Sequence, residues 1–342
     1  MRALGLFLLC IVVISALGAP VVAPYAIDQQ FRGLLNAPPT VPHIRDARGT
    51  WRAPFIYPWK LTNQLEQRYE QDRTTTVALS WFRGRHLVSS SDDARMPLLL
   101  IGADSFGRDV FTRLVYGGRL SLAVAAAAAA GALVFGALVG GIAGYSGGFV
   151  DDLLMRSTDF VIVLPAMYLA LALRSALSLV LPPFEVFALL TGIFALVGTP
   201  FIARGVRAIV RSEKQLDYSI AVSSLGASHA RLLFRHLLPA ASGFIGVEIT
   251  LLVPAFIVAE ATLSYVGLGF PDPVASWGTM LHDAQSVRAF TDFPWLLSPA
   301  AAMFLLVLGL NLVVQHAGVA PVYNETDGSS RRLRADSNAL RS

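Results

Sequence analysis

Long apolar runs alternate with polar segments along this chain. Six of the runs are long enough to cross the bilayer as helices, because about 20 apolar residues span its hydrocarbon core. The pattern therefore predicts an all-α polytopic membrane protein with six transmembrane helices and an extended external segment between the first two. The predicted spans are residues 4–25, 120–144, 153–180, 184–209, 240–267 and 294–319.

Composition agrees with a membrane protein. The chain has 342 residues, of which 54% are apolar and 15% are charged, whereas soluble domains have about 25% charged residues. The net charge of +4 comes from basic residues scattered over loops, without the aromatic-interleaved basic stripe of a nucleic-acid surface. Cys10 is the single cysteine, so an intramolecular disulfide is excluded.

Basic residues in the short loops predict the orientation, because cytoplasmic loops carry the excess of Lys and Arg. The loop after the fourth span has six basic residues and the C-terminal tail has four, while the loop after the fifth span has only Arg288 among three aspartates. We therefore expect the basic loop, the tail and the N-terminus on the cytoplasmic side of the membrane. The first span also fits a cleaved signal peptide, although its run is long for one.

The predicted domain organisation follows from these segments. Residues 1–25 form the first helix, 26–100 a proline-containing periplasmic insertion, and 101–118 an amphipathic helix at the external interface. We expect residues 119–319 to form the transmembrane core with a cytoplasmic loop at 210–239, and the tail, 320–342, to be disordered. Within the insertion we predict a helix over 61–72 and strands over 74–82 and 86–89, in a lid or packing element.

The interfacial helix is predicted to begin at an Asp104 cap and to expose its charged side chains. Its spacing Gly102-x4-Gly107 resembles a phosphate-binding loop. In that motif a Lys and a Ser or Thr follow the second glycine, but here Arg108-Asp109 follows Gly107. We also predict no strand before this loop. ATP hydrolysis is therefore not expected in this chain. The apolar face has Val110, Leu114 and Val115, and the charged face has Arg108, Asp109 and Arg113.

The basic loop contains a predicted helix–elbow–helix over residues 217–239. The first helix is expected to stop at Gly226, which adopts the left-handed backbone of a helix end. Ser228 can cap the second helix, and Pro239 is expected to close it. A rigid elbow between membrane spans fits a groove on a soluble partner, so we predict a docking loop.

Two features inside the spans are candidates for packing or transport. Gly136, Gly140 and Gly144 place small residues on one helix face, which lets a neighbouring helix approach closely. Glu260 is a carboxylate inside a span, where charge is costly, so Glu260 and Ser264 are candidates for a translocation path. A purely structural role for Glu260 is an equal alternative. The six histidines show no metal-ligand spacing.

Several motifs in a fixed order resemble the permease subunit of ABC importers, in the "C" type of the dipeptide, oligopeptide and nickel permease family. The resemblance covers about residues 100–300. The matching blocks are 101–110, 113–122, 144–148 with Asp151 and Asp159, Ala203-Arg204 with Arg207, the loop with Leu225-Gly226 and Arg235-His236, and 260–269 with 276–278.

The resemblance implies a type I importer permease fold and a set of partners. These are a second permease subunit, two ATP-binding subunits that hold ATP and Mg²⁺, and a periplasmic or lipid-anchored substrate-binding protein, with membrane lipid around them. The chain itself is then no enzyme and needs no cofactor. Peptides are the expected solute and nickel an alternative. The implied docking residues are Ala221, Leu225, Gly226, Ala227, Arg235, His236 and Pro239.

The chain departs from the family at two cytoplasmic positions. Ile220-Ala221-Val222 replaces the usual Glu-Ala-Ala of the loop, and 313–321 lacks the usual charged tail motif. A permease that has lost its coupling and acts structurally is therefore one alternative. Another is an intramembrane serine protease, because Gly144-Tyr145-Ser146-Gly147 fits a nucleophile motif with His282 or His316 as the base.

Overall fold

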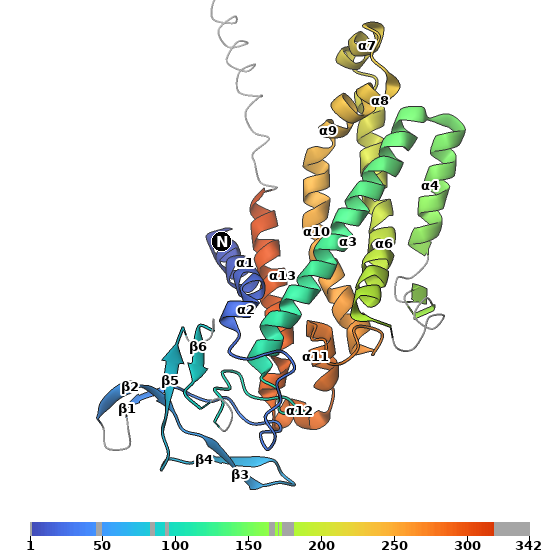
Figure 1. Ribbon diagram of the computed structural model, residues 1–342. Coiled ribbons are helices and arrows are strands. Elements are labelled where there is room, and N and C mark those ends of the chain that lie inside the picture. The colour runs from blue at the N-terminus through green and yellow to red at the C-terminus, as the bar shows by residue number, and fades with distance from the viewer. Residues whose placement is uncertain are drawn as a thin grey trace, which may run out of the picture.

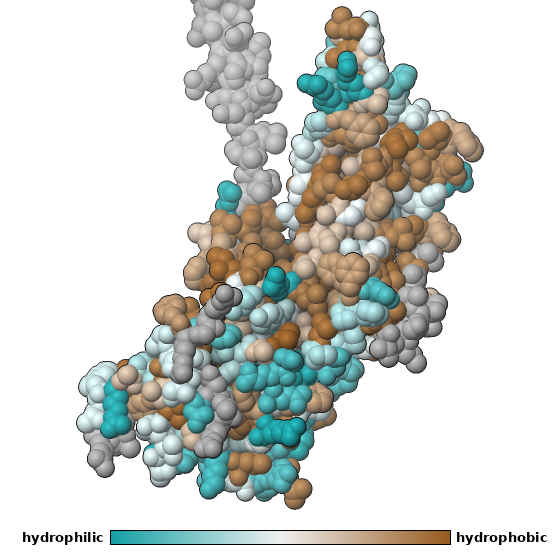
Figure 2. Space-filling model, viewed as in Figure 1, coloured by the Kyte–Doolittle hydropathy of each residue, from teal (hydrophilic) through white to brown (hydrophobic). Residues whose placement is uncertain are grey.

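A computed structural model gives the fold of the protein and describes residues 2–45, 50–82, 86–92, 96–163, 168–169, 171–172 and 181–317 (Figure 1). A bundle of tilted helices stands on a small β-rich domain, and the loop helices lie at the opposite end of the bundle. The predominantly helical membrane fold is confirmed. Apolar side chains dominate the surface of the bundle, while polar residues gather on the β-rich end (Figure 2).

Four helical segments of the described residues are long and apolar enough to span a membrane. They are α3 (Val110–Ser146), α6 (Pro183–Glu213), α10 (Ser242–Tyr265) and Pro294–Val314, which joins the 3₁₀ turn η2 (Pro294–Leu297) to α13 (Ser298–Ala317). The first apolar run forms α1 (Arg2–Leu17) and the short α2 (Ala19–Val22). The third predicted span begins as α4 (Gly148–Val163), and most of its remainder lies outside the described residues.

The separate interfacial helix predicted before the second span is wrong. Residues from Val110 onward belong to α3, which continues without a break to Ser146. Its cap is Asp109, whose side chain accepts a hydrogen bond from the Thr112 N–H, and not Asp104. Arg108 and Arg113 are buried rather than exposed, because acidic residues from distant loops meet them at this end of the helix.

The described residues between α2 and α3 contain six short strands. The four-stranded sheet has the order β1-β2-β5-β6, and a separate hairpin pairs β3 with β4. All four pairings are antiparallel. The predicted strands over 74–82 and 86–89 correspond to β5 and β6. The bounds are β1 His43–Arg45, β2 Trp51–Ile56, β3 Trp59–Asn63, β4 Arg68–Gln71, β5 Val77–Trp81 and β6 Val88–Ser90.

The helix predicted over 61–72 is wrong, because this stretch forms most of the β3–β4 hairpin. Leu61 pairs with Tyr69 and Lys60 with Glu70. Gln67 in the turn has a φ of 53°, which breaks a helix and suits a tight reversal. Half-buried and exposed positions alternate along both strands, as expected for a hairpin with one covered face.

Short helices complete the two ends of the bundle. At the end beside the β-rich domain, α11 (Trp277–Asp283) and α12 (Val287–Thr291) lie between α10 and α13. At the other end, α7 (Asp217–Ser224), α8 (His229–Leu232), the π-helical turn η1 (Leu233–Leu237) and α9 (Leu238–Ala240) connect α6 to α10. The bundle core lies mainly between α3, α6 and α10.

Candidate functional site

The predicted elbow is formed by α7 and α8. Gly226 has a φ of 83°, in the region that favours glycine. Its N–H donates to the Ser223 carbonyl at 3.0 Å, and the Ala227 N–H donates to the Val222 carbonyl at 3.3 Å. These two bonds are the Schellman arrangement that ends a helix on a left-handed residue. Backbone hydrogen bonds therefore set the change of chain direction between α7 and α8.

The second half of the loop differs from the prediction. Ser228 caps α8 through a bond from the Arg231 N–H to its hydroxyl, at 3.3 Å. Pro239 does not close the second helix, because it lies in the first turn of α9, where proline is tolerated. The π-helical turn η1 precedes it, and such turns absorb an interrupted α-helical bonding pattern. Helical structure thus continues to Ala240.

The loop presents one side to solvent and anchors the other in the core. Leu225 at the elbow is 88% exposed, and Ile220 on α7 is also exposed. Leu232, Leu233 and Leu237 are buried in the core beside α6. Of the other predicted docking residues, those at the surface are Ala221, Arg235 and Pro239, and those half-buried are Ala227 and His236.

A contact between Tyr145 and His229, which the sequence analysis missed, ties the loop to the end of α3. The Tyr145 hydroxyl forms a hydrogen bond with His229 Nδ1. Lys214 donates to the Tyr145 carbonyl at 2.7 Å, and its Nζ lies 4.6 Å from the centre of the Tyr145 ring. These contacts join α8 and the end of α6 directly to the end of α3.

Ion pairs fasten α4 to α6 at the same end. Asp151 is buried and accepts from Arg207 through both carboxylate oxygens, with Nη2 at 2.6 Å from Oδ2. Arg204 lies 2.5 Å from Asp159. The motif residues at these positions therefore serve the packing of α4 against α6, because a bidentate arginine–carboxylate pair fixes both distance and angle.

The glycine face of α3 lies against α6. A Cβ on Gly136 would lie 2.6 Å from Ile202 Cβ, and one on Gly144 would lie 2.6 Å from the Arg207 carbonyl oxygen. A Cβ on Gly140 would overlap the Ala203 carbonyl. Because these obstacles include backbone, all three positions exclude larger residues.

Glu260 is fully buried where α10 meets α3 and α11. Its carboxylate accepts from the Ser121 hydroxyl and from the Ser264 hydroxyl, each at 2.7 Å. The Ser121 hydroxyl oxygen in turn accepts from the Trp277 N–H at 3.2 Å. This arrangement links three helices through one carboxylate, which supplies acceptors where lipid supplies none. Ser264 also lines an external cavity of about 320 Å³.

Removal of this carboxylate is expected to destabilise the bundle. Glu260→Ala leaves a cavity and deprives the Ser121 and Ser264 hydroxyls of their acceptor, so we expect a loss of about 2–4 kcal/mol in the free energy of unfolding. Thermal unfolding in nanodiscs measures it. Glu260→Gln retains the volume and one acceptor and is expected to lose less. Equal stability of Glu260→Ala and the parent chain would contradict the bridging role.

Two buried arginines contact several carboxylates at the N-terminal end of α3. Arg108 lies 2.7 Å from Asp104 and 2.7 Å from Asp272, and 3.3 Å from Asp283. Arg113 lies 3.5 Å from Asp104 and 3.4 Å from Asp283. Burial raises the pKa of the Asp283 carboxyl above its ordinary value, and the arginines oppose that rise. The cluster fixes the loops on either side of α11 to the start of α3.

The cap residue Asp109 is expected to make stability pH-dependent. Burial raises the pKa of its carboxyl from 3.8 to about 7, although its hydrogen bonds to Thr112 act in the opposite direction. A carboxyl with a raised pKa in the fold stabilises fully below its unfolded pKa, and that contribution is lost as pH rises through about 7. As the pH rises from about 4 to about 7, the unfolding temperature of the parent should therefore fall more than that of Asp109→Asn. Parallel pH curves would contradict the prediction.

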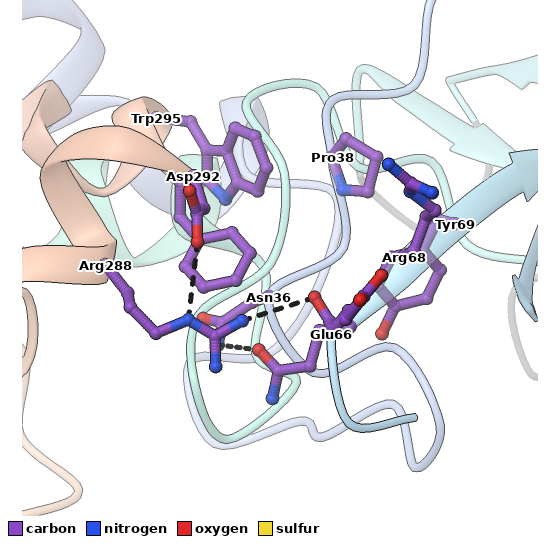
Figure 3. Close-up of a pocket in the computed structure, with 10 residues that line it drawn as sticks. Asn36, Pro38, Glu66, Arg68, Tyr69, Arg288, Asp292 and Trp295 are labelled. Atoms are coloured by element: carbon purple, nitrogen blue, oxygen red, sulfur yellow. Dashed lines mark hydrogen bonds and ion pairs between the residues drawn. The ribbon is translucent and has the colours of Figure 1, made fainter. Parts of the chain in front are cut away.

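A cleft of about 430 Å³ separates the β3–β4 hairpin from α12 and η2 (Figure 3). Arg288 of α12 spans it, donating to the Glu66 carbonyl at 3.3 Å and to Asp292 at 3.3 Å. Asn36 on its floor donates to the Gln67 side chain at 2.8 Å. The inserted hairpin is therefore joined to the loop between the fifth and sixth predicted spans, and the cleft lies at the β-rich end of the molecule.

The structure does not bring together the parts of the protease alternative. Ser146 is exposed at the last residue of α3. His282 belongs to α11 at the opposite end of the bundle, where its Nδ1 lies 2.7 Å from the Tyr265 carbonyl oxygen. The side chain of His316 lies outside the described residues. Among the described residues, His, Cys, Asp and Glu side chains form no group able to hold a metal ion.

The architecture is that of a membrane component with a small β-rich domain at one end of its helical bundle and a helical loop at the other. The sequence pattern of the binding-protein-dependent transport system inner membrane component family matches residues 136–317, more than half of the chain. The chain belongs to this family, and the resemblance to ABC importer permeases is confirmed. It is a membrane-spanning transport subunit, and the protease and structural-paralogue alternatives are not supported.

Two curated relatives have similar sequences. The oligopeptide transport system permease protein OppC of Bacillus subtilis is 41% identical over 62% of this chain and 67% of its own length. The dipeptide transport system permease protein DppC of Alkalihalophilus pseudofirmus is 38% identical over 62% and 67%. A solved amino acid ABC transporter with histidines is 17% identical over 59% of this chain and 91% of its own, with a TM-score of 0.44, which is too low to bear on the fold.

Proposed function

We propose that this chain forms half of the transmembrane path of an ATP-driven importer of peptides. The relatives are named as oligopeptide and dipeptide permeases, and each match covers 62% of this chain. A second permease completes the path, and a binding protein delivers the solute. In this proposal the elbow faces the cytoplasm, as do both termini, and the β-rich domain faces outward.

The exposed elbow is the observation that supports docking of an ATP-binding subunit. Its backbone bonds set the reversal, and Leu225 projects from it almost completely exposed. An exposed apolar side chain on a rigid protrusion suits a pocket on a soluble partner, where such anchors supply much of the binding energy. We propose that this partner is an ATP-binding subunit, that each of the two permeases docks one, and that ATP and Mg²⁺ are bound there. Glu260 and Ser264 are proposed to border the path beside the external cavity.

The external cleft suits the binding protein. Arg68 and Arg288 lie on its rim with Glu66 and Asp292, so the cleft offers both signs of charge. Charged rims speed association and fix orientation more than they add affinity. We propose that the periplasmic or lipid-anchored binding protein contacts this surface when it delivers the peptide.

Reconstituted uptake tests the function. The two permeases, two ATP-binding subunits and binding protein are placed in proteoliposomes, and a labelled peptide is supplied with ATP inside. We expect uptake that an unlabelled peptide of the same class abolishes and that excess nickel does not. Uptake of nickel without peptide uptake would show that peptides are not the solute. Failure of the ATP-binding subunits to copurify would contradict the proposal that the chain belongs to an ATP-driven importer.

Leu225→Ser tests the docking role of the elbow. The side chain makes little contact within the subunit, so folding should be unchanged, while copurification with the ATP-binding subunit should weaken by about tenfold, the loss expected from a side chain that contributes more than 1 kcal/mol to an interface. Leu216→Ser, also exposed and just before α7, serves as the control. Undiminished copurification of Leu225→Ser would contradict the assignment.

A further inference from the structure

The cavity of about 320 Å³ lies where the loop after α10 meets α11 and the start of α3. Its volume is at the lower end of the range for pockets that bind small ligands. Phe106, Phe270 and Val274 give it apolar walls, and charged and polar side chains complete the lining. The cavity therefore combines apolar surface with a few polar groups, as small-molecule sites do.

The polar lining offers hydrogen-bond acceptors that the protein leaves unused. Asp272 is bound to Arg108 through Oδ1 alone, and Asp283 contacts the two buried arginines through Oδ2 alone. The second oxygen of each carboxylate has no partner among the described residues. His282 Nδ1 lies 2.7 Å from the Tyr265 carbonyl oxygen. Because a carbonyl oxygen only accepts, Nδ1 carries the proton and Nε2 of the neutral ring is a further acceptor.

Negative charge exceeds positive charge around the cavity. With all five groups ionised, Arg108 and Arg113 supply two positive charges against the three carboxylates that contact them, so the group has a net charge of −1. Within the described ranges, no group of side chains could hold a metal ion. A primary ammonium group supplies one positive charge and three N–H donors, so it matches both the charge and the unused acceptors.

One donor beside the cavity is also unused, and it distinguishes between ammonium ligands. The Arg113 side chain lines the cavity and is 1% exposed, yet its Nη1 has no hydrogen-bond partner in the part of the chain that the structure describes. A buried guanidinium nitrogen without an acceptor is costly. The first residue of a peptide has a carbonyl oxygen next to its ammonium group, whereas a lysine side chain has no acceptor there.

We propose that this cavity binds the amino-terminal residue of the transported peptide, an inference that rests on the proposed import of peptides. Asp272 and Asp283 bind the ammonium group, and Arg113 donates to the first carbonyl oxygen. The first side chain of the peptide lies against Phe270 and Val274. The carboxyl end of the peptide is not recognised here, because the net negative charge of the cavity repels it.

Binding of short peptides to the complete importer tests this proposal. The importer, without its binding protein and without ATP, is placed in nanodiscs, and titrations followed by saturation-transfer NMR compare trialanine, trialanine amide and N-acetyl-trialanine. The amide keeps the ammonium group and should bind at least as tightly as trialanine. The acetylated peptide lacks that group and should bind about tenfold more weakly or less. Equal affinity of trialanine and N-acetyl-trialanine would overturn the assignment of the ammonium group.

Two variants of this chain locate the binding site. Asp272→Asn keeps the size of the side chain but removes its charge, so the affinity for trialanine should fall about tenfold. The matched control is Asp28→Asn, which removes an exposed carboxylate that does not line the cavity and should leave the affinity unchanged. Val274→Trp fills the cavity without changing any charge and should abolish binding. Unchanged unfolding temperatures verify that the variants are folded.

Uptake by the parent importer separates this inference from the proposed function. If the parent takes up trialanine while Asp272→Asn and Val274→Trp bind it as tightly as the parent does, the cavity assignment is wrong and the import of peptides stands. If the parent neither binds trialanine nor takes it up with its binding protein and ATP, both proposals are wrong.

Discussion

Gly226→Val should uncouple uptake from ATP hydrolysis. The glycine has a φ of 83°, and a Cβ there would meet open space. The effect is therefore conformational rather than steric against neighbours. A β-branched residue in this backbone region is strained by about 1–3 kcal/mol, which shifts the elbow toward other conformations and should lower uptake by about tenfold or more.

Gly226→Asn is the matched control for this prediction, since asparagine tolerates the left-handed backbone. It should retain most of the uptake, while Gly226→Val loses both uptake and the stimulation of ATPase activity by peptide-loaded binding protein. Both rates are measured on one proteoliposome preparation. If Gly226→Val and Gly226→Asn behave alike, the elbow conformation does not control coupling.

Gly140→Leu should prevent the correct assembly of the bundle. A Cβ at this position overlaps the Ala203 carbonyl and lies 2.9 Å from Ala203 Cα. Because the obstacle is the backbone of α6, neither helix can adjust by a rotamer change, and the cost should exceed the usual 1–3 kcal/mol of overpacking. We expect little monodisperse protein in detergent, measured by fluorescence-detected size-exclusion chromatography.

Gly246→Ala on α10 provides the control, because a Cβ there would meet nothing within 4 Å. Alanine is the better helix former, so this variant should be as stable as the parent or slightly more stable. Normal yield and stability of Gly140→Leu would show that α3 and α6 do not approach as closely as described.

The β-rich domain shows where local sequence patterns are insufficient. The stretch 61–72 has the charged residues typical of a surface helix, yet it forms most of the β3–β4 hairpin. The hairpin is favoured over a helix because Leu61 pairs with Tyr69 and because the Tyr69 hydroxyl donates to the Leu35 carbonyl at 2.6 Å. Residue 35 lies outside any local window around the hairpin, so a helical or strand propensity cannot include it.

The sequence by itself determined the apolar segments, the transport family and the elbow at Gly226, because hydrophobic length and helix-end chemistry are local properties. Only the tertiary structure showed that Arg108 and Arg113 are buried against Asp283, that Glu260 joins three helices, and that Leu87 bonds to Val21 of α2. Each of these contacts joins residues far apart in the chain. Whether a charged or aromatic side chain is buried or exposed is decided only when those segments pack together.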